Sequence, residues 1–120
     1  MRIIYENKVK AEGVCVHEFE EEKILIIFGD DVPEGLADYC YIVSVTPIYG
    51  EIKPGQTFKA DDLELKITSV GWAVPEILRG LGHCIFKFNG ASEEDLPGTI
   101  CVEEHDLPNI GVGSVIQILE

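Results

Sequence analysis

Residues Asp62–Val70 read DLELKITSV and show the dominant pattern of the chain. Leu63, Leu65 and Ile67 occupy alternate positions, and charged or hydroxyl residues stand between them. Because successive side chains of a β-strand point to opposite faces, this alternation predicts a strand with one buried and one solvated face. The stretch therefore favours a sheet protein.

Strand-forming residues recur along the rest of the chain. Seven further segments are rich in Val, Ile, Tyr, Phe or Thr, and turn residues separate them. These predicted strands are Arg2–Tyr5, Lys8–Phe19, Ile24–Phe28, Tyr39–Val45, His83–Phe88, Thr99–Glu103 and Ser114–Leu119. The acidic run Glu20–Glu22, between the second and third of them, predicts a solvated hairpin tip.

One short helix is predicted among these strands. Pro75 suits its first residue, because a proline lacks an N–H that the first turn would leave unpaired. Ile77, Leu78 and Leu81 share one face, and Gly82 suits the helix end. Many short strands and one short helix predict an all-β fold, a small closed or partly open β-barrel of about six to eight strands. Residues 1–120 are expected to form a single domain.

The charge balance is strongly acidic. Nine Lys and Arg residues against 22 Asp and Glu residues give a net charge of −13 at pH 7. This charge would repel nucleic acid and anionic lipid, so neither is an expected partner. The longest wholly apolar run, Ile24–Phe28, is too short to cross a membrane.

Two expectations concern the surroundings of the chain. Ile24–Phe28 is apolar on both faces, so it lies either at the centre of the fold or beneath a second subunit, which leaves a homodimer open. The N-terminus has no apolar stretch of signal-peptide length, so a cytoplasmic protein is expected.

The sequence predicts no metal and no other cofactor. Cys15, Cys40, Cys84 and Cys101 stand singly in apolar segments without a C-x-x-C pair, as free buried thiols do. His105 has acidic neighbours on both sides, but consecutive residues of a loop point apart and make a poor metal site. The chain also lacks the glycine-rich motifs that bind nucleotides.

Several stretches carry a family resemblance in a shared order. They are Leu36–Gly55 (LADYCYIVSVTPIYGEIKPG), Leu78–His83 (LRGLGH), Leu96–Thr99 (LPGT) and Gly113–Val115 (GSV). Together they resemble the glucitol/sorbitol-specific IIA proteins of the bacterial sugar phosphotransferase system. The resemblance implies a cytosolic protein that accepts a phosphoryl group from the histidine phosphocarrier protein and passes it to the IIB/IIC part of a sugar permease.

The resemblance also points to one position. In this family the strand matching Tyr39–Val45 runs into a His-x-His-Gly stretch, whose first histidine carries the phosphoryl group. Val43 stands at that phosphoacceptor position here, and alternation places Val43 and Val45 on one face. A valine has no lone pair to attack phosphorus, and the neighbouring hydroxyls of Ser44 and Thr46 have no base beside them.

His83 is therefore the candidate catalytic residue, because it lies within the family's own LGH motif. Alternation along its strand places His83 on the face of Lys87, half-exposed at a barrel end with a cation nearby to offset phosphate charge. A structural role, bonding a backbone carbonyl where Gly82 lets the chain turn, is the alternative. His17 is expected to be a half-buried strand residue without a chemical role.

Two functions follow. The first is a phosphocarrier that works through His83. The second is a non-phosphorylatable IIA-like barrel that regulates a permease or binds a partner or metabolite, because Val43 occupies the usual phosphohistidine position. Incubation with the upstream phosphotransferase components would separate them.

Overall fold

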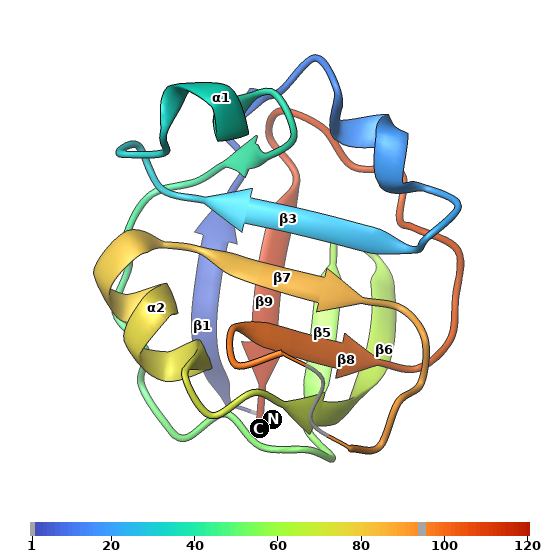
Figure 1. The fold of residues 1–120 in the computed structure, drawn as a ribbon. Helices are drawn as coiled ribbons and strands as arrows, with labels where there is room; N and C mark the ends of the chain where they lie inside the picture. Colours follow the sequence, from blue (N-terminus) through green and yellow to red (C-terminus); the bar gives the residue numbers. More distant parts are fainter. Residues whose placement is uncertain (1, 94–95) are drawn as a thin grey trace.

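Nine strands form one curled sheet across residues 2–93 and 96–120, the part of the chain that this computed structural model describes (Figure 1). The strands are β1 Ile3–Lys8, β2 Ala11–Glu12, β3 Ile24–Phe28, β4 Tyr41–Ile42, β5 Thr57–Ala60, β6 Leu63–Val70, β7 Cys84–Lys87, β8 Thr99–Val102 and β9 Val115–Leu119. The helices are the 3₁₀ helix η1 Val16–Phe19, α1 Glu34–Ala37 and α2 Val74–Leu81.

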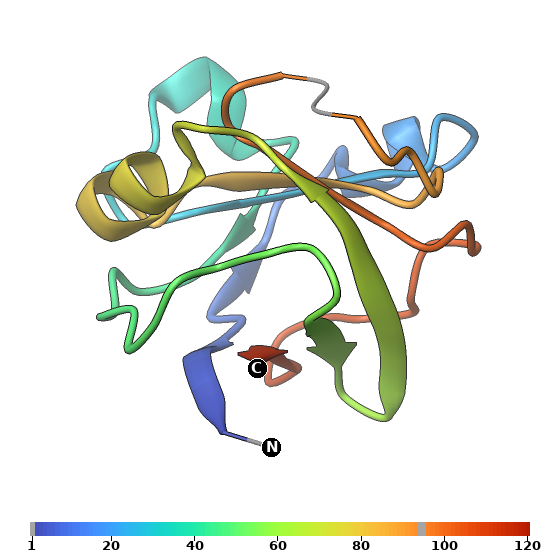
Figure 2. The ribbon, with the colours of Figure 1, turned by 90° about the horizontal axis from the view of Figure 1, so that it is seen from below.

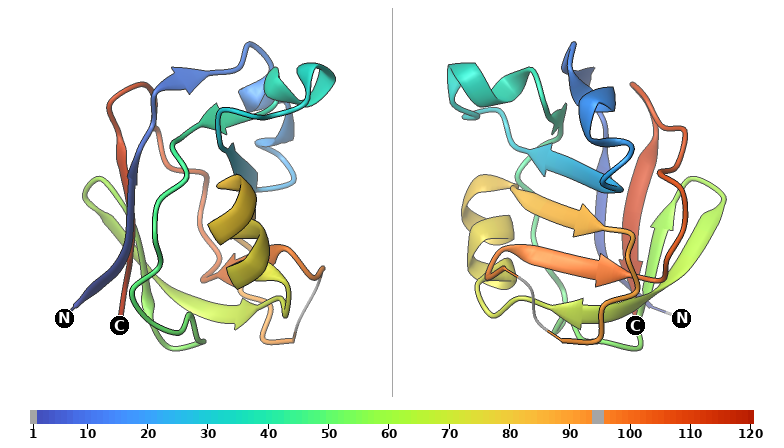
Figure 3. Two further views of the ribbon diagram at one scale, coloured as in Figure 1. Left: turned by 90° about the vertical axis from the view of Figure 1, so that its left-hand side faces the viewer. Right: turned by 45° about the vertical axis from the view of Figure 1, so that its right-hand side comes forward.

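The sheet order is β1-β9-β5-β6-β8-β7-β3-β4-β2, with parallel pairs only at β3–β4 and β7–β8 among these strands. β6 is long enough to pass from one side of the curl to the other, so β1, β9 and β5 face β8, β7 and β3 (Figures 2 and 3). The two end strands, β1 and β2, follow each other in the chain. The predicted all-β, partly open barrel is confirmed, although with nine strands instead of about six to eight.

The core fills the space between the two sides of the curl. Phe58 packs against Phe86 and Phe88, with ring centroids 4.8 and 5.7 Å apart. In β6, Leu65 and Ile67 are buried and the charged residues between them are exposed, as the alternation predicted. Burial of such large apolar side chains is the main stabilising term of the fold.

The apolar strand β3 lies inside the sheet, between β4 and β7. Leu25, Ile27 and Phe28 are buried within the single chain, so a central position accounts for this apolar run. A homodimer therefore stays a prediction. No helix in the described ranges combines the length and apolarity that crossing a membrane requires.

The prediction of one continuous strand over Lys8–Phe19 is wrong. β1 ends at Lys8, β2 has two residues, and η1 follows. A Cβ atom on Gly13 would lie 2.3 Å from the carbonyl oxygen of Asp38, so only glycine permits the close backbone approach at this corner. The acidic run Glu20–Glu22 consequently joins a 3₁₀ helix to β3, and it is not a hairpin tip between two strands.

One further strand was predicted too long, and one strand was not predicted. Of the segment Tyr39–Val45, only Tyr41–Ile42 pairs as a strand, and the chain then runs toward Pro47, which has no N–H for a sheet ladder. β5 was not predicted, because its lysine and alanine weaken the local strand signal. It forms because β6 and β9 pair with it on either side.

The helix α2 confirms its prediction and brings the chain to the site. It begins at Val74, buries Leu78, and ends at Gly82, whose φ of +68° is readily adopted by glycine. The Gly82 N–H donates to the Leu78 carbonyl oxygen at 3.0 Å. α2 lies across one end of the curl, beside the segment that follows β4 (Figure 3).

Candidate functional site

His83 lies between the end of α2 and the start of β7, and its side chain is half-exposed. Its Nδ1 atom lies 3.0 Å from the carbonyl oxygen of Ile27. Its ring also stacks on Phe28, with centroids 4.4 Å apart and planes 25° apart. Both contacts come from β3, so the neighbouring strand holds the imidazole in one orientation.

The contact with Ile27 decides which ring nitrogen can react. A carbonyl oxygen only accepts hydrogen bonds, so the neutral His83 ring carries its proton on Nδ1 and donates it to Ile27. Nε2 then holds the lone pair, and it makes no hydrogen bond within residues 2–93 and 96–120. The hydrogen bond that orients the ring therefore also leaves Nε2 with the lone pair that a nucleophile needs.

Two cations need to be distinguished near His83. Lys87 lies four residues farther along β7, a distance of about 13 Å at the rise of an extended strand. Arg79 lies in the last turn of α2, about one helical turn before His83, and its side chain is exposed. Arg79 therefore offers the positive charge at this end of the barrel.

Val43 is buried in the core with 0% of its surface exposed. Its N–H donates to the Phe28 carbonyl oxygen at 2.8 Å. Val45 is 52% exposed, so the prediction that Val43 and Val45 share one face is wrong. The alternation fails here because β4 ends at Ile42 and the following residues do not form a strand.

Val43 and His83 lie at the same end of the barrel but on opposite sides of β3. Phe28 pairs with Ile42 of β4, and its neighbour Ile27 pairs with Cys84 of β7. Two strand spacings therefore separate the two positions, about 10 Å. The backbone at His83 is therefore displaced by about 10 Å from the backbone at Val43, where the family resemblance implies the phosphoacceptor.

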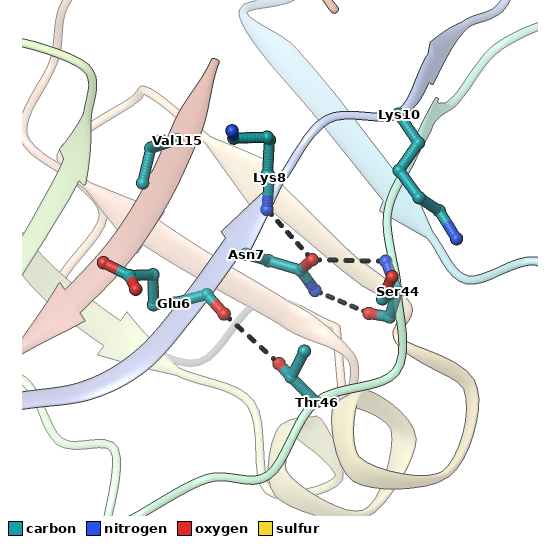
Figure 4. A pocket seen from close by; sticks show the side chains of 7 residues that line it. All are labelled: Glu6, Asn7, Lys8, Lys10, Ser44, Thr46 and Val115. Atoms are coloured by element: carbon teal, nitrogen blue, oxygen red, sulfur yellow. Dashed lines mark hydrogen bonds between the residues drawn. The ribbon is translucent and has the colours of Figure 1, made fainter. Parts of the chain in front are cut away.

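The buried side-chain amide of Asn7 links β1 to the segment that follows β4 (Figure 4). The Nδ2 atom of Asn7 donates to the Ser44 carbonyl oxygen at 2.5 Å, and its Oδ1 accepts from the Ser44 N–H at 3.2 Å. The side chain thus pairs with Ser44 as a backbone peptide group would. The sequence signal for Asn7 is a lone amide at an inward position between buried Tyr5 and Val9, and it was missed.

The Asn7 amide stands in a hollow of about 440 Å³. The Thr46 hydroxyl donates to the Glu6 carbonyl oxygen at 3.4 Å, and Lys10 forms an ion pair with Asp30 at 2.6 Å. Neither Ser44 nor Thr46 has a histidine or carboxylate bonded to its hydroxyl among the described residues. Nothing here activates them as nucleophiles.

The other two histidines lie elsewhere. His17 is an exposed residue of η1, with Nδ1 2.6 Å from Glu20 Oε1, so its prediction as a half-buried strand residue is wrong. His105 is exposed and its Nδ1 donates to the Asp106 carbonyl oxygen at 2.7 Å. Within the described residues, no three His, Cys, Asp or Glu side chains are grouped to hold a metal ion.

The four cysteines have no disulfide partner in the structure. Cys40, Cys84 and Cys101 are buried, and Cys15 is half-buried. Burial raises the pKa of the Cys40 thiol to about 11, and burial also raises the pKa of Cys84. Since the thiolate is the reactive form, the Cys40 and Cys84 thiols are inert near neutral pH.

Comparison with known proteins agrees over almost the whole chain. Residues 4–117 match the family described as the PTS system glucitol/sorbitol-specific IIA component. The PTS system glucitol/sorbitol-specific EIIA components of Shigella flexneri and of Escherichia coli (strain K12) are each 30% identical over 117 residues, covering 98% of this chain and 95% of theirs.

A solved structure shares the fold. The crystal structure of the PTS system IIA component from Enterococcus faecalis V583 superposes with a TM-score of 0.80 at 22% sequence identity, covering 97% of this chain and 100% of that one. The match of family, sequence relatives and fold is continuous from one end of the barrel to the other. This chain belongs to the glucitol/sorbitol-specific IIA component family of the phosphotransferase system.

Proposed function

We propose that this IIA component is a cytoplasmic phosphocarrier that takes up a phosphoryl group on Nε2 of His83. The donor is the histidine phosphocarrier protein and the acceptor is the IIB/IIC part of a sugar permease, as the family implies. The hydrogen bond between His83 Nδ1 and the Ile27 carbonyl oxygen carries this proposal, because it leaves the lone pair on the half-exposed ring at Nε2.

The transfer balances without an added co-reactant. The Nε2 lone pair of His83 attacks phosphorus, the bond between phosphorus and the partner's nitrogen breaks, and that nitrogen keeps the electron pair. The His83 ring gains positive charge while its Nδ1–H stays hydrogen-bonded, so the Ile27 carbonyl dipole stabilises the phosphorylated ring. The second transfer runs in the reverse sense toward the permease.

A second function is favoured by Val43. This residue fills the family's phosphoacceptor position with an apolar, fully buried side chain. A barrel without any phosphorylated histidine would act as a regulatory protein, or bind a partner or a metabolite. The two functions differ in one measurable property, which is covalent uptake of phosphate.

Phosphorylation of the full chain tests the proposal. The protein is incubated with phosphoenolpyruvate, enzyme I and the histidine phosphocarrier protein, and its intact mass is measured. We expect one acid-labile phosphoryl group in the wild type and none in His83→Ala. His17→Ala and His105→Ala serve as matched controls and should keep the label, because both side chains are exposed and make contacts that do not involve His83. A label that survives His83→Ala would place the site elsewhere, and no label on the wild type would favour the second function.

A further inference from the structure

Residues 44–49 follow β4 and form a partly exposed surface segment, the crest. Thr46 lines three separate hollows, and Pro47 lines two of them. One hollow, of about 360 Å³, lies between residues 45–48 and Arg79 of α2. Figure 3 shows this green segment running beside the yellow helix α2 at the open end of the curl.

Exposed apolar side chains lie on the crest and at the end of α2. Val45 is 52% exposed, Tyr49 is 65% exposed, and Leu81 at the end of α2 is 46% exposed. The Val45 side chain and the backbone of Leu81 both approach Gly29, where an added Cβ atom would lie 3.0 Å from Val45 Cγ2 and 2.5 Å from the Leu81 carbonyl oxygen. Val45 therefore lies next to the end of α2, and two neighbouring elements each expose an apolar side chain, as interaction surfaces do.

Arg79 supplies the charge of this surface. The four residues that line its hollow with it, Val45, Thr46, Pro47 and Ile48, are all uncharged. No carboxylate pairs with Arg79 among the described residues, whereas Arg2, Lys10 and Lys23 each pair with one. An unpaired guanidinium in a hollow without acids, on a chain of net charge −13, fits an anionic group on the partner.

Backbone donors add to the same preference. The N–H groups of Val45 and Thr46 donate to no acceptor within residues 2–93 and 96–120, because this stretch has left the sheet. A guanidinium and free backbone N–H groups are the donors that phosphoryl oxygens accept from most readily. The residues that line this hollow therefore include donors that suit a phosphoryl group, and exposed apolar side chains stand near it for contact with the protein that carries the group.

We propose that Arg79, Val45 and Leu81 form a docking surface for the phosphoryl-bearing face of a partner protein. Arg79 pairs with the phosphoryl group, while Val45 and Leu81 contact apolar residues around it. The proposal rests on the proposed function, and it identifies where the donor seats. Because α2 ends directly before His83, docking here brings the phosphoryl group to the end of the barrel that carries Nε2.

Binding of the histidine phosphocarrier protein tests this surface. The His83→Gln background blocks transfer, and enzyme I with phosphoenolpyruvate keeps the carrier phosphorylated while affinity is measured. We expect Arg79→Ala to weaken binding of the phosphorylated carrier about tenfold or more, as loss of a charged hydrogen-bond partner does. Binding of the unphosphorylated carrier should change less than about twofold, because it has no anion for Arg79 to hold.

Matched variants guard against a general loss of charge or folding. Lys66→Ala removes one exposed positive charge from β6 and should leave the affinity unchanged. Val45→Glu should weaken both forms of the carrier, whereas Val14→Glu changes an exposed valine that lines none of the three hollows and should weaken neither. Arg79→Ala binding equal to the wild type, Val45→Glu binding equal to the wild type, or no binding of either carrier form would overturn the docking proposal.

The two proposals fail differently. Arg79-dependent binding of the phosphorylated carrier, with no label on wild-type protein, would overturn the relay through His83 and keep the docking surface. A His83 label that forms at an unchanged rate in Arg79→Ala would overturn the docking surface and keep the relay.

Discussion

Two residues of β3 determine the tautomer and the orientation of the His83 ring. Ile27 determines which nitrogen carries the proton, and Phe28 holds the plane of the ring. Val43 touches the opposite side of the same strand through its N–H. One strand end therefore has on one side Val43, where the family resemblance implies the phosphoacceptor, and on the other the candidate nucleophile His83, about 10 Å away between backbones.

Cys40 makes a pH-dependent contribution to stability. Burial raises its pKa from 9.0 to about 11, so above pH 9 the unfolded thiol releases a proton that the folded one keeps. The stability difference between wild type and Cys40→Ala should stay constant below about pH 8. It should then shift against the wild type as the pH rises through 11. Urea unfolding at matched pH values checks this, and a difference that stays constant up to pH 11 would contradict it.

α2 is defined by its two ends. Val74 and Pro75 begin it, and the left-handed Gly82 ends it, so that the candidate nucleophile His83 follows directly, just before β7. Gly80 and Gly82 stand two residues apart but meet different surroundings. A Cβ atom on Gly80 would meet nothing within 4 Å, while one on Gly82 would lie 3.1 Å from the Gly29 nitrogen.

These two glycines give opposite predictions for the same substitution. Gly80→Ala should stabilise the protein by about 0.5–1 kcal/mol, because alanine favours the helix and has free space. Gly82→Ala should destabilise it by about 1–2 kcal/mol or more, since φ is +68° and the new atom crowds the backbone of Gly29, the residue after β3. Thermal unfolding of both variants measures the pair, and a stabilising Gly82→Ala would show that the left-handed cap is not required.

The whole barrel is closed by a side chain as well as by strands. β1 carries Asn7, whose amide pairs with both the N–H and the carbonyl group of Ser44, and the Tyr49 N–H donates to the Ile4 carbonyl oxygen at 2.8 Å. These contacts hold residues 44–49, the crest, along β1, where regular strand pairing is absent. The candidate docking surface thus depends on the closure of the barrel.

Asn7→Ala should reduce the free energy of unfolding by about 1–3 kcal/mol, because it leaves the half-buried backbone N–H and carbonyl groups of Ser44 without this partner. Asn89→Ala is the matched control. Its amide accepts one hydrogen bond from Ala91 in an exposed turn, so its effect should be smaller, within about 0.5 kcal/mol. Denaturant unfolding of both variants compares them, and equal losses would show that the Asn7–Ser44 pairing does not close the barrel.

The sequence by itself determined the elements whose signal is local. Alternation predicted β6 and β7, and a proline, an apolar face and a glycine predicted α2, because these patterns follow from the geometry of strands and helices. The same local patterns were misleading at Lys8–Phe19 and silent at Thr57–Ala60. There the outcome depends on a backbone crossing at Gly13 and on neighbours that pair from both sides.

The sequence likewise predicted only part of the candidate site. The family resemblance carried by the sequence pointed to His83 as the candidate and to Val43 as the residue at the implied phosphoacceptor position. Only the tertiary structure shows that Nε2 is the His83 nitrogen that keeps a lone pair, because the Ile27 carbonyl that binds Nδ1 lies 56 residues away in the chain. Likewise only the fold brought Arg79 beside residues 45–48, since contacts between a helix and a distant irregular segment leave no periodic trace in the sequence.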